Sequence, residues 1–174
     1  FIDECFIELV PDHDESFIKF ITKYNNLFIL FSLTKSFALA GLRIGYGIGS
    51  KQMISVLNKI KIPWNVSGLA QQSASAALLH SFYLTKVKKM IKKESFYLIN
   101  YISKLKNFQC NATSTNFILI KTKMKSKTLQ KKLLEKKILI RDCSTIRGLN
   151  DNYIRIAVKT RKENEKLIKA LERL

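Results

Sequence analysis

Apolar positions in the first part of the chain follow the periods of alternating strands and helices. Leu27–Ser32 is a short, almost continuous apolar run, which predicts a strand buried on both faces, as in parallel sheets covered by helices. Apolar residues at roughly helical spacing predict a helix over residues 15–24, and Leu42–Gly49 is typical of a further strand. Residues 1–6 have the pattern of the end of a buried strand. Strands that alternate with helices indicate an α/β fold.

Helices are expected through the middle of the chain. Ser50 is suited to cap a helix that runs to about residue 61, and an alanine-rich helix follows over about residues 67–79. Between them lies Pro63-Trp64-Asn65, where Trp64 suits an aromatic side chain packed at a helix boundary. A long periodic run over residues 82–105 predicts a helix that connects two domains.

Strand and helix patterns alternate again after Cys110. Strands are predicted over Asn116–Lys121, Ile138–Arg141 and Tyr153–Val158, with a basic helix over residues 127–136. Thr160 and Glu163 form a capping-box pattern that opens a last amphipathic helix. This pattern predicts a small α+β domain over residues 109–174, a linking helix over residues 81–108, and part of a large α/β domain over residues 1–80.

The chain carries a large positive charge. It has 31 Lys+Arg against 13 Asp+Glu, a net charge of +18, which is compatible with an anionic partner. The lysines are spread along predicted helices, however, and no zinc-finger spacing or aromatic–basic RNA-binding pattern accompanies them. We interpret the charge as a lysine-biased surface and expect neither a nucleic-acid nor a membrane partner. No apolar run approaches the roughly 20 residues that span a bilayer.

The cysteines and histidines indicate no metal or disulfide chemistry. Cys5, Cys110 and Cys143 are odd in number and far apart, so neither a disulfide framework nor a zinc site is expected, and a cytoplasmic location fits. His13 and His80 are isolated from one another, which favours a structural or surface position for each.

Candidate chemistry lies in an ordered set of polar residues: Asp3, Ser32-x-x-Lys35, Arg43 and Arg155. The run from Ser32 to Tyr46, SLTKSFALAGLRIGY, resembles the lysine motif of the class I/II aminotransferases. Within that family the chain is most similar to the branch with histidinol-phosphate aminotransferase and threonine-phosphate decarboxylase. The resemblance extends from Asp3-Glu4 to residues 155–165, and therefore covers nearly the whole chain.

The resemblance implies a fold and an organisation. The chain would be the C-terminal part of a fold-type-I enzyme dependent on pyridoxal 5′-phosphate (PLP), with part of a three-layer α/β/α large domain and a small α+β domain. The family's phosphate-binding loop and ring-stacking aromatic would lie upstream of the position matched by Asp3. We therefore expect a large N-terminal part before Phe1, a homodimer, and no turnover by these 174 residues alone.

The resemblance also assigns roles to residues. Lys35 would bind the cofactor aldehyde and move protons, and Asp3 would keep the pyridine nitrogen protonated. Ser32, Thr34 and Arg43 would hold the cofactor phosphate. Arg155 would bind the carboxylate of a small phosphorylated amino-acid substrate, with Arg141 as a further substrate contact. Weaker candidates are Tyr46, Asn116 and Arg161.

One departure from the family pattern bears on the reaction. Aminotransferases of this group usually have tyrosine three residues after the aspartate, whereas this chain has Phe6. The segments Pro63–Ser67 and Ile140–Ser144 also resemble threonine-phosphate decarboxylases. Our leading hypothesis is therefore decarboxylation of L-threonine O-3-phosphate to (R)-1-amino-2-propanol phosphate, a step of cobalamin biosynthesis. The alternatives are histidinol-phosphate aminotransferase, a related class I/II aminotransferase, or a non-catalytic basic binding domain.

Overall fold

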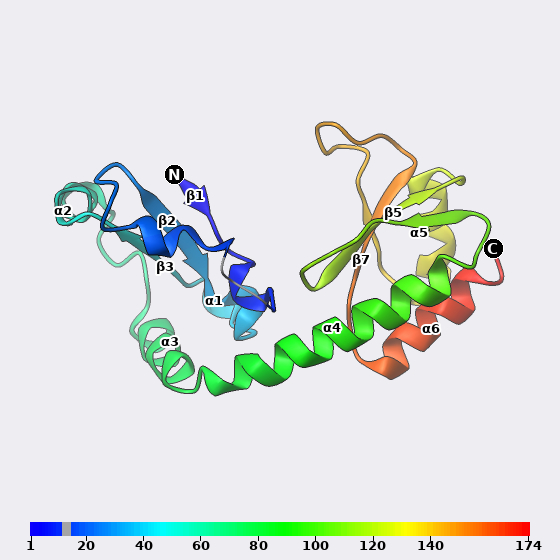
Figure 1. Cartoon of the computed structure of the whole chain (residues 1–174), viewed down its shortest axis with the longest axis horizontal. Helices are drawn as coiled ribbons and strands as arrows, with labels where there is room; N and C mark the ends of the chain where they lie inside the picture. Colours follow the sequence, from blue (N-terminus) through cyan, green and yellow to red (C-terminus); the bar gives the residue numbers. More distant parts are fainter. Residues whose placement is uncertain (12–14) are drawn as a thin grey trace. The chain divides into compact units, whose positions relative to one another are not determined.

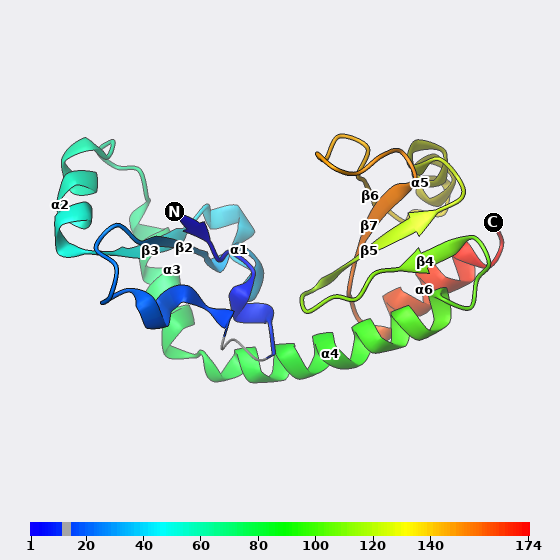
Figure 2. The ribbon, with the colours of Figure 1, turned by 45° about the horizontal axis from the view of Figure 1, so that its top comes forward.

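A computed structural model describes residues 1–11 and 15–174, so His13 lies outside the described residues. The chain divides into two compact units, Phe1–Lys88 and Lys89–Leu174. The ribbon of the whole chain is drawn in Figures 1 and 2.

The first unit is built on a three-stranded sheet in the order β1-β2-β3. The strands are β1 (Ile2–Asp3), β2 (Phe28–Ser32) and β3 (Gly45–Gly49). β1 runs parallel to β2, whereas β3 is antiparallel to it. Ile29 and Phe31 alternate with less buried neighbours along β2 and form a buried cluster with Leu27. The strand predicted over Leu27–Ser32 is therefore confirmed, in a mixed sheet.

The helices of the first unit follow their predicted caps. Its α-helices are α1 (Leu33–Ser36), α2 (Lys51–Ile60) and α3 (Gly68–Leu79). The Ser50 side chain accepts a hydrogen bond from the backbone N–H of Met53, which satisfies an otherwise unpaired donor at the start of α2. Ala70 and Ala74 of α3 pack with Leu33 and Ile44 in a second buried cluster.

Two predicted elements of this unit are shorter than expected. The helix predicted over residues 15–24 is wrong: the segment contains the 3₁₀ turn η3 (Phe17–Phe20) in place of an α-helix. The cause is tertiary, because buried Glu4 accepts hydrogen bonds from the Ser16 hydroxyl and the Phe17 N–H, each at 2.7 Å. The strand predicted from Leu42 begins only at Gly45, since η4 (Ala40–Leu42) precedes it and Arg43 has a left-handed backbone with φ 52°.

Trp64 is not packed, contrary to the prediction. Its side chain is 98% exposed and belongs to neither buried cluster of the first unit. The backbone of Trp64 has φ 55°, a conformation that L-residues rarely adopt, directly after Pro63. The combination directs the indole away from α2 and α3.

The second unit is a four-stranded antiparallel sheet in the order β4-β5-β7-β6. Its strands are β4 (Phe108–Cys110), β5 (Phe117–Thr122), β6 (Arg141–Asp142) and β7 (Tyr153–Ala157). The helices α5 (Ser126–Glu135), α6 (Arg161–Leu171) and the C-terminal part of α4 (Phe82–Ile102) pack against one face of this sheet. In Figures 1 and 2, α6 lies along the end of α4 that belongs to this unit.

The core of the second unit lies between sheet and helices. Ile118 and Ile120 of β5 and Ile154 and Ile156 of β7 are buried against side chains such as Leu133 of α5. Because side chains alternate along a strand, the residues between them point to the opposite face of the sheet. The predicted strands at 116–121 and 153–158 and the capping box of Thr160 and Glu163 are confirmed.

The strand predicted over Ile138–Arg141 is reduced to two residues. The N–H groups of Lys137 and Ile138 donate to the last carbonyls of α5, those of Leu134 and Leu133, at 2.8 and 2.9 Å. Lys137 has φ 57°, so these residues form the left-handed turn that closes a helix and cannot pair in a sheet.

Candidate cofactor and substrate site

Asp3 ends one strand, and Lys35 follows the parallel strand beside it. Asp3 ends β1 opposite Leu30 of β2, and β2 leads directly into α1, which carries Lys35. Because β1 and β2 are parallel, their carboxyl ends meet at one edge of the sheet. Both side chains are exposed. The sequence-predicted pair is thus brought to the same edge of the first unit.

The Asp3 carboxylate is held in its charged form. Its Oδ1 accepts a hydrogen bond from the backbone N–H of Cys5 at 2.9 Å. Hydrogen bonds from the Cys5 thiol and N–H lower the pKa of Asp3, and the positive charge of Lys35 adds to that effect. An ionised carboxylate is the partner that a protonated pyridine nitrogen requires.

Cys5 and Phe6 lie near Lys35. The Lys35 Nζ lies 5.2 Å from the centre of the Phe6 ring, so the departure from the family pattern falls beside the lysine. Burial and the adjacent Asp3 carboxylate raise the pKa of the Cys5 thiol to about 11, and Cys5 is therefore a neutral hydrogen-bond donor at pH 7. Sequence reasoning missed Cys5, although its position two residues after a strand-ending aspartate is a signal for an Asx turn.

Ser32 and Arg43 are brought together by the pairing of β2 with β3. Ser32 lies opposite Gly45, and the N–H of Leu33 donates to the carbonyl of Ile44 at 3.3 Å. The Ser32 side chain caps α1 by accepting from the N–H of Thr34. The exposed Arg43 guanidinium donates to the carbonyl of Ala40 at 3.0 Å. The hydroxyls of Ser32 and Thr34 and the guanidinium of Arg43 are donors suited to a phosphate.

Tyr46 has a packing role in this structure. Its ring stacks on Phe31 at 4.9 Å between centroids, and its hydroxyl donates to Glu8 at 3.3 Å. Burial and the negative charge of Glu8 raise the pKa of Tyr46 to about 12. The phenol is thus engaged with Glu8, and no feature of this contact points to a cofactor.

Arg141 and Arg155 share the open face of the second sheet. They form a cross-strand pair between β6 and β7, and Arg155 lies between buried Ile154 and Ile156, so it points away from the core. The Arg155 guanidinium lies 4.8 Å from the centre of the Phe117 ring, which supports it by a cation–π contact. Two guanidinium groups on one face can bind a carboxylate or a phosphate.

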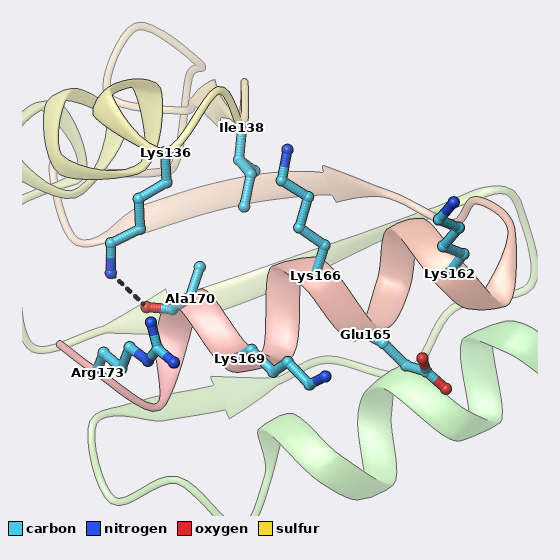
Figure 3. Close-up of a pocket in the computed structure, with 8 residues that line it drawn as sticks. All are labelled: Lys136, Ile138, Lys162, Glu165, Lys166, Lys169, Ala170 and Arg173. Carbon is cyan, nitrogen blue, oxygen red and sulfur yellow. Dashed lines mark hydrogen bonds between the residues drawn. The ribbon is translucent and has the colours of Figure 1, made fainter.

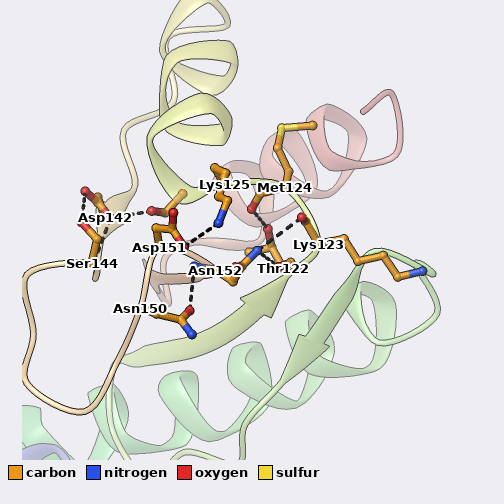
Figure 4. A network of polar contacts seen from close by, with 10 residues as sticks. Thr122, Lys123, Met124, Lys125, Asp142, Ser144, Asn150, Asp151 and Asn152 are labelled. Carbon is orange, nitrogen blue, oxygen red and sulfur yellow. Dashed lines mark hydrogen bonds and ion pairs between the residues drawn. The ribbon is translucent and has the colours of Figure 1, made fainter.

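A polar network fixes the chain that follows Arg141 (Figure 4). The Asp142 carboxylate accepts from the hydroxyls of Ser126 and Ser144 at 2.6 and 2.8 Å, and these contacts, the one from Ser126 first, lower the pKa of Asp142. Asp151 is paired with Lys125, and Asn152 donates to the carbonyl of Thr122. The network anchors both ends of the loop between β6 and β7, on the strands that carry the two arginines.

Arg161 is occupied by a structural partner. Its guanidinium donates to both carboxylate oxygens of Glu94, at 2.9 to 3.2 Å, and lies 3.5 Å from the centre of the Tyr97 ring. Asn164 donates to the same carboxylate at 3.0 Å. These contacts give Arg161 a structural role, and its substrate role stays a prediction. The Asn116 amide oxygen accepts from the Thr115 hydroxyl, and the Asn116 carbonyl accepts from the N–H of Val158.

Residues 1–11 and 15–174 contain neither a metal-binding cluster nor a helix that could span a membrane. No three His, Cys, Asp or Glu side chains in these ranges come close enough together to hold a metal ion. Within the same residues, no helix has the length and apolar character needed to cross a bilayer.

The model of the family "Aminotransferase class I and II" matches residues 1–171. The chain belongs to this family. The family uses PLP, and the groups at the sheet edge suit that cofactor: an ionised carboxylate, an exposed lysine, and hydroxyls beside a guanidinium.

Similar proteins include histidinol-phosphate aminotransferases and threonine-phosphate decarboxylases. Histidinol-phosphate aminotransferase 2 of Archaeoglobus fulgidus is 35% identical over 173 residues, which are 99% of this chain and 49% of that protein. The crystal structure of histidinol-phosphate aminotransferase from Clostridium acetobutylicum has a TM-score of 0.93 at 34% identity, over 98% of this chain and 53% of that one. L-Threonine-O-3-phosphate decarboxylase from Porphyromonas gingivalis has a TM-score of 0.90 at 28% identity, over 99% and 54%.

The chain therefore has the mixed α/β fold of fold-type-I aminotransferases over about half of their length. Most of the similar curated proteins are histidinol-phosphate aminotransferases. The larger number of aminotransferases among these relatives favours the aminotransferase alternative over the decarboxylase hypothesis.

Proposed function

We propose that this chain supplies the catalytic lysine and the substrate-binding arginines of a PLP-dependent aminotransferase that acts on histidinol phosphate. The observation that carries the proposal is the placement of ionised Asp3 and exposed Lys35 at one edge of a sheet. Support for the substrate comes from the names of the most similar proteins.

Each residue at the sheet edge has a distinct task in this proposal. The Lys35 amine would hold the cofactor through its aldehyde and would move a proton at the substrate carbon. Ionised Asp3 would pair with a protonated pyridine nitrogen, and the hydrogen bond from the Cys5 N–H fixes the carboxylate. Ser32, Thr34 and Arg43 bind the cofactor phosphate. When bound, PLP withdraws the electron pair left at the substrate carbon.

The arginines of the second unit bind the substrates' anionic groups in this proposal. Arg155 binds the carboxylate of the amino acid or 2-oxo acid that exchanges the amino group, and Arg141 contacts the substrate on the same sheet face. The stack of Arg155 on Phe117 limits the orientations of its guanidinium. A fixed guanidinium orients the bound carboxylate, and thereby selects which bond at the substrate carbon reacts.

A second candidate function is decarboxylation of threonine phosphate. Phe6 favours it, because the ring next to Lys35 lacks the hydroxyl that aminotransferases of this group usually have there. The Porphyromonas gingivalis decarboxylase is a structural relative with the same coverage of this chain.

One experiment separates these functions. The full-length enzyme is incubated with PLP and either histidinol phosphate plus 2-oxoglutarate, with glutamate as the readout, or threonine phosphate, with carbon dioxide as the readout. Glutamate formation without carbon dioxide supports the aminotransferase. Carbon dioxide released from threonine phosphate at the higher rate overturns it in favour of the decarboxylase.

A Lys35→Ala variant is the control for PLP dependence. It should abolish either product while the far-UV circular dichroism spectrum stays unchanged, because the exposed Lys35 side chain does not contribute to a buried core. If neither product forms and added PLP gives no protein-bound absorbance band, the non-catalytic basic domain is favoured.

A further inference from the structure

Outside the candidate site, a hollow is lined mainly by positively charged side chains. It measures about 500 Å³ and lies between α6 and the turn that follows α5 (Figure 3). Its lining includes one carboxylate, that of Glu165, among five cationic side chains: Lys136, Lys162, Lys166, Lys169 and Arg173. All of these residues belong to the second unit, and the proposed function uses none of them.

The cations are arranged by the period of α6. Lys162, Lys166 and Lys169 are spaced by four and three residues, which places them on one face of the helix along about 10 Å of its axis. All three are exposed, and within the described residues none of their side chains makes a hydrogen bond or an ion pair. The first turn of α6 carries the positive end of the helix dipole, which adds to the field at Lys162.

Lys136 and Ile138 form the opposite side of the hollow. The Lys136 Nζ donates to the Ala170 carbonyl at 3.4 Å and so joins the end of α5 to α6. In Figure 3, Ile138 lies between the side chains of Lys136 and Lys166, whereas Glu165 and Lys169 both extend toward α4. Ile138 and Ala170 thus form the apolar part of the lining, with Lys136 and Lys166 on either side of Ile138.

The size and lining of the hollow indicate a class of ligand. Volumes of roughly 300 to 1,000 Å³ are typical of small-molecule sites. Lysine ammonium groups are common phosphate ligands, and several of them within about 10 Å match the closely spaced charges of an oligophosphate. Within the described part of the chain, no aromatic side chain lines the hollow, so it lacks the stacking platform of single-strand nucleic-acid sites.

We propose that this hollow is a binding site for a small oligophosphate, such as the triphosphate group of a nucleotide. The site is independent of the proposed catalytic function. Binding weakens as the salt concentration rises, because exposed ammonium groups are screened by salt.

The test measures binding of inorganic tripolyphosphate to the whole chain by isothermal titration calorimetry at low salt. The variant Lys162→Gln/Lys166→Gln/Lys169→Gln, named the groove variant, removes three cations that line the hollow. Its dissociation constant for tripolyphosphate should rise at least about tenfold. The matched control is Lys121→Gln/Lys123→Gln/Lys127→Gln, which removes the same charge from exposed positions of the second unit outside the hollow. It should change the dissociation constant less than about twofold.

Three outcomes would overturn the proposal. An equal loss in both variants would mean that the probe senses net charge alone. A single-stranded oligonucleotide that binds more tightly than tripolyphosphate, and loses its binding in the groove variant, would mean a nucleic-acid surface. If the groove variant unfolds by circular dichroism, Ile138→Glu places a repelling carboxylate in the apolar part of the lining and should cause the same tenfold loss. Unchanged affinity in that variant would also contradict the site.

Discussion

Glu94 is 5% exposed, and its carboxylate receives hydrogen bonds from Arg161 and Asn164. A carboxylate buried without such partners would be destabilising, so the contacts join α4 to the start of α6. The hydrogen bond from Arg161 lowers the pKa of Glu94, with a smaller contribution from Asn164. This pair also explains why Arg161, conspicuous beside Arg155 in the sequence, is occupied in the folded chain.

Replacing Glu94 by glutamine should lower the free energy of unfolding by about 2 kcal/mol at pH 7. Breaking a buried ion pair costs about 3–5 kcal/mol, and the value is reduced here because the Arg161 side chain is 42% exposed and regains water. Because the folded pKa of Glu94 is lowered, its contribution is present above the unfolded value near 4.5 and is lost as the pH falls through the folded pKa. The acid sensitivity of the second unit should therefore be smaller in Glu94→Gln.

Urea unfolding followed by circular dichroism at neutral and acidic pH tests this prediction. The matched control is Glu135→Gln, which replaces an exposed carboxylate on α5. It should leave the urea midpoint unchanged. An equal urea midpoint for Glu94→Gln and the unsubstituted chain at neutral pH would contradict the stabilising role of the pair.

The pairing of β2 with β3 is the element-scale contact that brings Ser32 close to Arg43. It depends on Gly45, where an added Cβ would lie 2.4 Å from the backbone carbonyl oxygen of Phe31. A backbone atom cannot rotate away as a side-chain tip can, so the strand itself must shift. Gly41, only four residues earlier, has open space at the same atom.

Gly45→Ala should therefore destabilise the first unit by about 1–3 kcal/mol, whereas Gly41→Ala should be close to neutral. Thermal unfolding of both variants gives the comparison. In the full-length enzyme, Gly45→Ala should also weaken PLP affinity, because a shift of β3 also moves Arg43, which lies two residues before the strand, relative to Ser32. Equal unfolding temperatures for the two variants would show that β3 does not pack as described.

Several elements could be predicted because their signals are local. Ser50 and Thr160 are caps that bond within their own turns, and the apolar alternation of β5 and β7 marks their buried face. The structure of residues 15–24 could not be predicted, because the start of this segment is fixed by hydrogen bonds to Glu4. That carboxylate accepts from Ser16 and Phe17, 12 and 13 residues later in the chain. The same holds for Arg161, whose partner Glu94 lies 67 residues away.

The residues of the candidate site also differ in whether a local sequence signal identifies them. One motif is enough to propose Ser32, Lys35 and Arg43. The elements that carry them, from β2 to the start of β3, follow one another closely in the chain. The role of Cys5 in holding Asp3 could not be proposed, because a thiol after an aspartate has many other uses. Whether Arg155 binds a substrate depends on its orientation, for which no sequence pattern exists.

At the scale of the whole molecule, Trp64 is a probe of what covers the first unit. It is the single tryptophan of the chain, and its side chain is 98% exposed. Its fluorescence in the 174-residue chain should match that of free tryptophanamide and be fully quenched by iodide. In a full-length homodimer, blue-shifted and protected emission is expected if the added half or the partner subunit covers this segment. Equal quenching in both proteins would mean that Trp64 faces solvent throughout.

Cofactor binding by the chain alone is expected to be weak. The chain spans about half the length of its curated relatives, and the family's phosphate-binding loop and stacking aromatic would lie upstream of Asp3. Lys35 is exposed, so its amine reacts with an aldehyde much as the other exposed lysines do. Asp3 and Arg43 alone supply too few contacts to offset the entropy of holding a small ligand.

Peptide mapping after incubation with PLP and borohydride reduction checks this expectation. In the 174-residue chain the label should be distributed over many of the exposed lysines, without turnover of histidinol phosphate or threonine phosphate. In the full-length enzyme it should concentrate on Lys35, and Lys35→Ala should disperse it again. Exclusive labelling of Lys35 in the short chain, or measurable turnover by it, would show that these residues form a competent site by themselves.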